Sequence, residues 1–193
     1  MSDQQIAKPS VEALRKELKR VNNKKEYRKV LRNTLIVVVT VAAFAVLVSS
    51  FFITVLKVTG DSMTPTLETG KIVIAQNQST FEPGDLIAFY YNNKILVKRV
   101  IAQAGEWVDI AEDGTVYVNN VKIDEPYVTE LAFGECDIQL PYQVPESRIF
   151  VMGDHRDVSI DSRSTTIGCV AEEQIVGKII FRIWPYQDAG AVQ

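Results

Sequence analysis

Few residues in this chain could act in catalysis, and the number of histidines limits which mechanisms are possible. The 193 residues include a single histidine, His155. A Ser-His-Asp hydrolase would need His155 as its base, and a serine hydrolase without that histidine must use another base, for which lysine is the known substitute. A zinc site made of His and Cys would have only His155, Cys136 and Cys169 to draw on. We therefore expect no metal centre and no cofactor.

The candidate nucleophile is Ser62 and the candidate base is Lys98. Ser62 lies in the sequence GDSMTPTL, and Lys98 lies in ILVKRVI, where its neighbours are apolar. Each has an ordinary explanation too, because a serine near Gly and Pro is usually a turn residue and a strand lysine usually points to water. A lysine base must be neutral, so its pKa must fall from about 10.4 towards ~8, which costs about 3 kcal/mol. Burial among apolar side chains can supply that shift.

An uncharged run of 24 residues lies between Arg32 and Lys57. At about 1.5 Å per residue, a helix of this length exceeds a hydrocarbon core of roughly 30 Å, so we predict a transmembrane helix over residues 34–56. A secretory signal peptide has a shorter apolar region of about 7 to 15 residues. A buried core helix would need to be covered on all sides.

The charges divide the chain into two parts of opposite sign. Residues 1–33 hold ten Lys or Arg against four Asp or Glu, whereas the other 160 residues hold eleven against twenty. The positive-inside rule therefore predicts a cytoplasmic N-terminal segment over residues 1–33 and an external domain over residues 57–193. Anionic lipid headgroups explain the basic block better than nucleic acid does. Residues 11–32 are expected to form a surface helix, and residues 1–10 are typical of disorder.

After Lys57 the apolar runs become short and are separated by Gly, Pro and Asn, which indicates strands and turns. Asn92-Asn93 and Asn119-Asn120 each have the two-residue spacing of a hairpin turn. Residues from about 104 to 148 are acidic and rich in turns, and we expect them to form a small inserted β subdomain. The fold class is therefore mainly β. The predicted strands are 71–76, 86–91, 94–101, 107–110, 115–118, 121–124, 149–152 and 178–184.

The two cysteines lie in the part of the chain that we expect outside the membrane, where a disulfide could persist. The sequence does not place Cys136 near Cys169. A disulfide and two free thiols both remain possible interpretations.

Several separated motifs follow one another in the external part. They are GDSMTPTL, PGD at 83–85, VKRVIAQAGE at 97–106, GTVYVN, and MGDHRDVSIDSR at 152–163. In this order, after one apolar segment, they resemble the type I signal peptidases over nearly all of residues 35–185. The single span resembles the Gram-positive form of that family.

This resemblance implies a membrane-bound serine endopeptidase with an antiparallel, barrel-like β catalytic domain. Its expected activity is removal of N-terminal signal peptides from secreted preproteins, after small residues at the first and third positions before the cut, the A-x-A pattern. The implied partners are preproteins and the lipid bilayer, with no nucleic acid and no metal. The implied location is the cell membrane, with a single pass and the catalytic domain on the external side.

The resemblance also implies roles for individual residues. Ser62 would be the nucleophile, with its backbone N–H as an oxyanion donor, and Lys98 would be the general base. Ser159 would hydrogen-bond the lysine amine and orient its lone pair. An extended substrate would lie along the strand that holds Lys98 and the segment that leads to Ser62. The residues expected to line its binding site are Met63, Leu96 and Val97.

Charged residues around this pair would brace the site. Arg99 alternates to the opposite face of the strand from Lys98, and the resemblance implies Asp154 as its ion-pair partner. Asp161 and Arg163 would pair with each other.

Three positions depart from the family pattern. Gly60 stands where some relatives have a serine that supplies a second oxyanion donor. His155 stands where the family usually has Asn, and we expect a structural polar role for it. Glu106 replaces a frequent Asp.

Two other functions fit parts of this sequence. A membrane-tethered pilus-assembly factor of the same family could act without proteolysis, but both Ser62 and Lys98 are present. A self-cleaving repressor protease shares Ser-Lys chemistry, but it needs a DNA-binding module where this chain has its apolar segment.

Overall fold

The structure is a computed structural model that describes residues 10–78 and 80–192. It divides into two compact units, one ending at Ser49 and the other beginning at Ser50. The disorder expected for residues 1–10 lies outside the described residues, except for Ser10.

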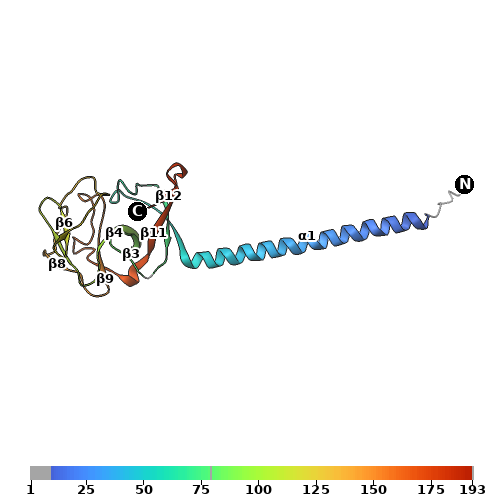
Figure 1. Cartoon of the computed structure of the whole chain (residues 1–193), viewed down its shortest axis with the longest axis horizontal. Coiled ribbons are helices and arrows are strands. Elements are labelled where there is room, and N and C mark those ends of the chain that lie inside the picture. Colours follow the sequence, from blue (N-terminus) through green and yellow to red (C-terminus); the bar gives the residue numbers. More distant parts are fainter. Residues whose placement is uncertain (1–9, 79, 193) are drawn as a thin grey trace. The chain divides into compact units, whose positions relative to one another are not determined.

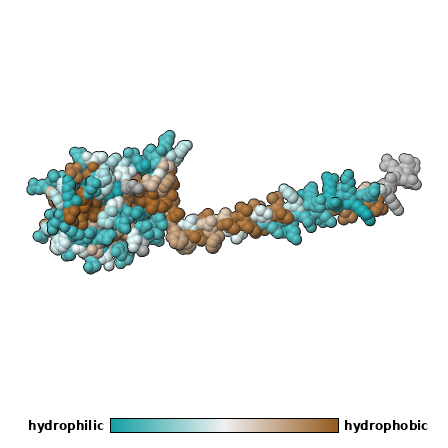
Figure 2. All heavy atoms as spheres, in the orientation of Figure 1, coloured by the Kyte–Doolittle hydropathy of each residue, from teal (hydrophilic) through white to brown (hydrophobic). Residues whose placement is uncertain are grey.

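A single helix, α1 (Val11–Phe52), makes up the described part of the first unit and extends three residues past it. Its N-terminus is capped by the side chain of Ser10, which accepts a hydrogen bond of 3.2 Å from the N–H of Ala13. The half nearest the N-terminus is charged and the other half is apolar (Figure 2). The apolar half is long enough to cross a membrane. The predicted surface helix and the predicted membrane span are therefore one continuous helix.

The end of α1 differs from the prediction. The helix stops at Phe52, four residues before the predicted boundary at 56, and the chain continues as strand β1 (Ile53–Lys57). This strand pairs antiparallel with β2 (Ile72–Gln76), from Ile53 opposite Gln76 to Lys57 opposite Ile72. The apolar run continues without a break through this point, so hydropathy does not mark the change. A long-range strand pairing decides it.

The larger sheet of the second unit is antiparallel throughout. Strands β3, β4, β9, β11 and β12 of this sheet are labelled in Figure 1. Its strands lie in the order β1, β2, β11, β3, β4, β9, β10, and β12 pairs with β11. Short 3-10 helices, η1 (Glu172–Gln174) and η2 (Tyr186–Asp188), flank β11. The remaining strands of this sheet are β3 (Leu86–Tyr91), β4 (Lys94–Ala102), β9 (Arg148–Met152), β10 (Val170–Ala171), β11 (Ile175–Trp184) and β12 (Gly190–Ala191).

A smaller sheet is formed by the chain between β4 and β9. Its order is β7, β6, β5, β8, and its strands are β5 (Trp107–Ile110), β6 (Val116–Val118), β7 (Val121–Lys122) and β8 (Tyr142–Gln143). These strands fall within the residues for which we expected an inserted subdomain. The prediction of a mainly β, antiparallel fold after one N-terminal apolar helix is confirmed.

Both predicted asparagine hairpins are present. Tyr91 pairs with Lys94 across the first turn, and Val118 pairs with Val121 across the second. The asparagines of the second turn both adopt positive φ, 52° and 64°. A two-residue hairpin loop with a type I′ turn requires positive φ at both positions. The sequence does not predict β8, β10 or β12, each only two residues long.

The cysteines are both free thiols. Cys169 is buried in the apolar cluster that also contains Val108 and Phe150, and burial raises the pKa of its thiol to about 11. The pKa of Cys136 is also raised, chiefly by burial. Both thiols are therefore expected to stay protonated at neutral pH.

Candidate active site

Ser62 lies in a tight turn that follows β1. Gly60, which precedes the turn, has a φ of +90°, where an L side chain would be strained, so a serine would fit poorly at this position. The turn is closed by a hydrogen bond of 3.1 Å from the N–H of Thr64 to the carbonyl of Asp61. Met63 and Leu67 are buried in the apolar core and anchor the turn, while Ser62 stays partly exposed.

Lys98 and Arg99 are consecutive residues of β4, so their side chains leave opposite faces of the sheet. The strand is central at this point, because Lys98 pairs with Ile87 of β3 and Arg99 pairs with Met152 of β9. Both side chains are buried, with 3% and 1% of the residue exposed. The alternation of the strand thus places Lys98 and Arg99 on opposite faces. The central position of the strand buries both of them.

The amine of Lys98 is held by a hydroxyl group. Its Nζ lies 2.8 Å from the Oγ of Ser159, in hydrogen-bond contact. Among the residues that the structure describes, no carboxylate is within ion-pair distance of this amine. Burial lowers the pKa of Lys98 to about 8, although the more distant charge of Asp161 opposes the shift. A substantial fraction of the amine is therefore neutral at mildly alkaline pH.

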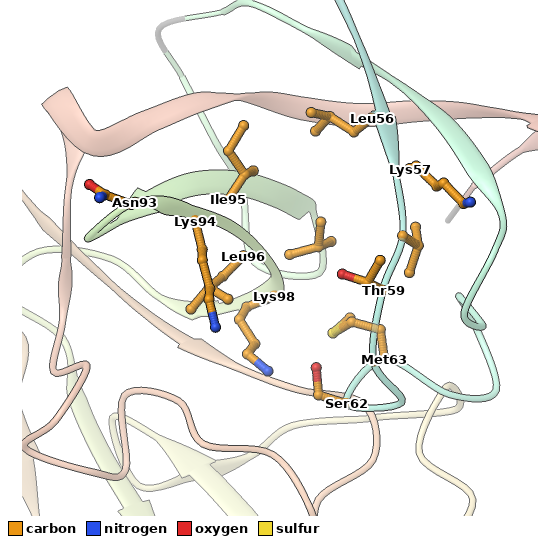
Figure 3. A pocket seen from close by; sticks show the side chains of 13 residues that line it. Leu56, Lys57, Thr59, Ser62, Met63, Asn93, Lys94, Ile95, Leu96 and Lys98 are labelled. Atoms are coloured by element: carbon orange, nitrogen blue, oxygen red, sulfur yellow. The ribbon is translucent and has the colours of Figure 1, made fainter.

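Ser62 and Lys98 meet at one end of a groove. Figure 3 shows the Ser62 hydroxyl and the Lys98 amine pointing toward one another from two different segments of the chain. The groove is lined by residues 56–60, 62–63 and 93–98. The three residues expected to contact substrate, Met63, Leu96 and Val97, are all among them.

On the other face of β4, Arg99 is fully paired. Its Nε and Nη2 donate to the two carboxylate oxygens of Asp154 at 2.8 and 2.7 Å. Its Nη1 donates to the carbonyl of Gly84 at 2.7 Å, and its guanidinium carbon lies 3.8 Å from the ring centre of Tyr127. Thr66, from the turn that holds Ser62, donates to Asp154 at 2.5 Å. The ion pair therefore links the strand to that turn.

Asp161 and Arg163 brace the loop that follows β9. Arg163 donates to both carboxylate oxygens of Asp161 at 2.9 Å, and both side chains are fully buried. Asp161 also accepts the N–H of Gly153 at 3.0 Å, and Arg163 donates to the carbonyl of Ser159 at 3.2 Å. These contacts fix Ser159 where it reaches the Lys98 amine.

Gly153 is a site residue whose role the sequence does not reveal. A Cβ at this position would lie 2.2 Å from the Oγ of Ser159 and 2.5 Å from the carbonyl oxygen of Ser62. Any side chain here would push apart the two segments that flank the lysine amine. The glycine stands in the MGD motif, but only the folded chain shows what fills the space beside it.

Arg156 and Glu125 form a third buried ion pair, and the sequence does not predict this one. Both Nη atoms of Arg156 donate to the carboxylate of Glu125, the Nη1 contact at 3.0 Å. Tyr127 also donates to Glu125, at 3.0 Å. Arg156 belongs to the loop with Ser159, whereas Glu125 follows β7 of the smaller sheet. The two residues are 31 positions apart, so no local pattern indicates the pair.

His155 lies against the turn that holds Ser62. Its backbone N–H donates to the carbonyl of Ser62 at 3.1 Å. Its Nδ1 is 2.9 Å from the Oγ1 of Thr64 and 3.3 Å from the carbonyl oxygen of Asp61. The side chain thus makes polar contacts with Asp61, before Ser62, and with Thr64, two residues after it.

Comparisons with known proteins identify relatives of this chain. Signal peptidase IB of Staphylococcus aureus strains Mu50 and N315 is 37% identical over 168 residues, covering 76% of this chain and 86% of the relative. The chloroplastic thylakoidal processing peptidase 1 of Arabidopsis thaliana is 35% identical over 141 residues, covering 64% of this chain and 40% of that protein. A solved signal peptidase I of Enterococcus faecalis V583 has 29% identity and a TM-score of 0.44, covering 51% of this chain and 96% of that one.

The family model described as signal peptidase, peptidase S26, matches residues 31–184. This range contains the Ser62 turn, the β4 lysine and the loop after β9. With relatives at this level of identity over most of the chain, the protein belongs to the signal peptidase family and is a serine protease that removes signal peptides.

Proposed function

We propose that Ser62 is the nucleophile and Lys98 the general base of this signal peptidase. The observation that carries the proposal is the buried amine of Lys98, whose pKa is lowered to about 8 and which points toward Ser62 (Figure 3). A buried lysine without a carboxylate partner is costly to keep charged, so it loses its proton readily. That is the property a lysine base needs.

The reaction would proceed by two acyl transfers. Lys98 takes the hydroxyl proton of Ser62 as Oγ bonds to the scissile carbonyl carbon, and the oxyanion accepts the backbone N–H of Ser62. The ammonium of Lys98 then gives its proton to the departing amine as the peptide C–N bond breaks. Lys98 then takes a proton from a water molecule as its oxygen bonds to the acyl carbon. The ester bond to Oγ breaks, the ammonium of Lys98 returns the proton to Ser62, and the acyl product leaves with a new carboxyl end. Ser159 holds the amine in place through both steps.

The substrate would bind as an added strand in the groove. The pairing of β4 with β9 begins at Arg99, so along residues 94–98 β4 pairs on one side only, with β3. An extended peptide can lie between this strand and the segment that leads from β1 to Ser62. Alternate side chains of a strand share a face, so the first and third residues before the cut would both point into the groove. Small residues at these two positions, as in A-x-A sites, fit that arrangement.

The apolar half of α1 would anchor the enzyme in the cell membrane. We place residues 1–33 in the cytoplasm and the span over residues 34–52, with the catalytic domain outside from β1 onward, four residues earlier than the boundary at 57 that the sequence predicts. The excess of basic residues before the span supports this orientation. The preprotein's apolar segment lies in the same bilayer, so anchoring both molecules raises their effective concentration.

Mass-spectrometric mapping of the cut in a preprotein tests the proposal, with the full chain in detergent or liposomes. The wild type should cut after an A-x-A site, and Ser62→Ala and Lys98→Ala should each lose activity by more than about a thousandfold. Lys122→Ala is a matched control, since this lysine is exposed on β7 of the smaller sheet. Retained cleavage by Lys98→Ala would contradict the assignment of the base. A wild type that binds the preprotein without cutting would favour an assembly role.

A further inference from the structure

The peptide group between Asp61 and Ser62 is held unusually firmly for part of a surface turn. Its carbonyl oxygen accepts hydrogen bonds from two groups of Thr64, the N–H at 3.1 Å and Oγ1 at 2.8 Å. The Nδ1 of His155 is a third polar neighbour, at 3.3 Å. Asp61 is exposed, so water could supply hydrogen bonds to its carbonyl oxygen. The main effect of these protein contacts is therefore to fix the direction in which the carbonyl points.

The same contacts define which ring nitrogen of His155 carries hydrogen. Thr64 has a single hydroxyl hydrogen, and it is donated to the Asp61 carbonyl. The Nδ1 of His155, 2.9 Å from that hydroxyl oxygen, must therefore be the donor in their contact. The Asp61 carbonyl is also purely an acceptor. His155 thus carries its hydrogen on Nδ1, and both contacts of its side chain with the turn use this hydrogen.

Holding the Asp61 carbonyl also aims the N–H of Ser62. The two groups belong to one planar peptide unit and point in opposite directions, so fixing the first fixes the second. On the other side of Ser62, its own carbonyl accepts the backbone N–H of His155 at 3.1 Å. Residue 155 therefore contacts both peptide units that flank the nucleophile. An oxyanion donor works only when it already points at the developing charge.

We infer that His155 is a positioning residue that aims the Ser62 N–H at the oxyanion, through the contacts of its Nδ1–H with Thr64 and the Asp61 carbonyl. The inference rests on the proposed function, in which that N–H is the oxyanion donor. The backbone contact from residue 155 to Ser62 does not depend on the side chain. Replacing the imidazole therefore removes its contacts with the Asp61 carbonyl and with the Thr64 hydroxyl, while the rest of the turn keeps its anchors.

Three substitutions of His155 distinguish a role of its Nδ1 from a role of its Nε2. The amide nitrogen of an asparagine can occupy the place of Nδ1, whereas that of a glutamine reaches only the place of Nε2. With the full chain in detergent and a preprotein-derived peptide, His155→Ala and His155→Gln should lower kcat about tenfold, with KM changed less than about twofold. His155→Asn should recover most of the lost kcat. The midpoint of the pH profile should stay near the wild-type value in all three, since the base is unaltered.

Thr64 provides a second approach that keeps His155 in place. Thr64→Val preserves the shape but removes the bridging hydroxyl, so kcat should fall by a similar factor, and Thr64→Ser should restore it. Combined with His155→Ala, the loss should be smaller than the product of the two single effects, because both act on one carbonyl. Melting temperatures of all variants identify any that fail to fold, and the Thr64 pair decides the question in that case.

Two results would overturn the inference: His155→Ala with wild-type kcat, or rescue by glutamine in place of asparagine, which would assign the work to Nε2. Ser62→Ala in the same assay separates this failure from failure of the proposed function. If Ser62→Ala is inactive and His155→Ala is unaffected, only the positioning role is lost. If Ser62→Ala still cuts, the nucleophile itself is wrong.

Discussion

Lys98 and Arg99 are adjacent buried residues on the two faces of β4, and their surroundings differ. Arg99 has a carboxylate partner with two hydrogen bonds, a backbone carbonyl and an aromatic ring against its guanidinium. Lys98, nearly as inaccessible, has one hydroxyl contact and, among the described residues, no carboxylate within ion-pair distance. The difference is not one of depth in the protein. It lies in whether the charge is compensated.

This contrast separates a structural cation from a reactive one. A paired guanidinium stays charged and holds its partners in place, since arginine does not lose its proton in proteins. A buried ammonium without a partner of opposite charge is destabilised by the loss of its hydration, so its pKa falls and it releases its proton more readily. One side of the strand thus holds its neighbours rigidly, and the other side provides the environment that the proposed proton transfer needs.

The largest effect should follow from removing the compensation on the Arg99 face. Asp154→Ala leaves a buried guanidinium without its carboxylate and should lower the free energy of unfolding by about 3 to 5 kcal/mol. Urea denaturation measures this loss. Asp157→Ala, an exposed carboxylate in the same loop, is the matched control and should change stability by less than about 0.5 kcal/mol. A loss below about 1 kcal/mol for Asp154→Ala would mean that Arg99 does not need its partner.

On the other face of β4, removing the cation of Lys98 should raise the free energy of unfolding, whereas Asp154→Ala lowers it. The pKa of Lys98 falls from 10.5 in the unfolded chain to about 8 in the folded one, so folding at pH 7 carries a penalty of up to about 3 kcal/mol. Lys98→Met should therefore be more stable than the wild type at pH 7, although inactive. The unfolded state binds more protons between pH 8 and 10.5, so the wild type gains stability as pH rises and the difference should vanish near pH 10.5.

Urea midpoints of both proteins at pH 7 and pH 10.5 check this prediction. Lys94→Met is the control, because this lysine lies in the same groove but is exposed. A Lys98→Met variant that is less stable than the wild type at pH 7 would indicate that the ammonium is compensated after all.

A smaller effect is expected in the pH dependence of cleavage. Only the neutral amine of Lys98 can accept the Ser62 proton, so kcat/KM should rise about tenfold per pH unit below pH 8 and level off above it. Initial rates at substrate concentrations far below KM, across pH 6 to pH 10, measure the profile. A profile that is flat from pH 6 would exclude a base with the environment that Lys98 has.

The sequence predicts the parts of this contrast that depend on local pattern. Strand alternation places Lys98 and Arg99 on opposite faces, and the Asn92-Asn93 turn indicates the hairpin to which their strand belongs. Partners that come from far along the chain are harder to predict. Tyr127 stacks on Arg99, and Glu125 pairs with Arg156 across 31 residues, without any periodic signal. The strand β1 is missed for the same reason, since its apolar residues would suit a helix equally well until β2 pairs with them.

The pair of Glu125 and Arg156 has a consequence for attempts to trim the enzyme. Deleting the smaller sheet, together with the segment after β7, would strip Arg156 of its carboxylate and Arg99 of its aromatic cover. The loop after β9 would then hold a buried guanidinium without a carboxylate partner. A minimal version of this peptidase therefore has to keep that insertion, or replace Arg156 with an uncharged side chain of similar volume in the same step.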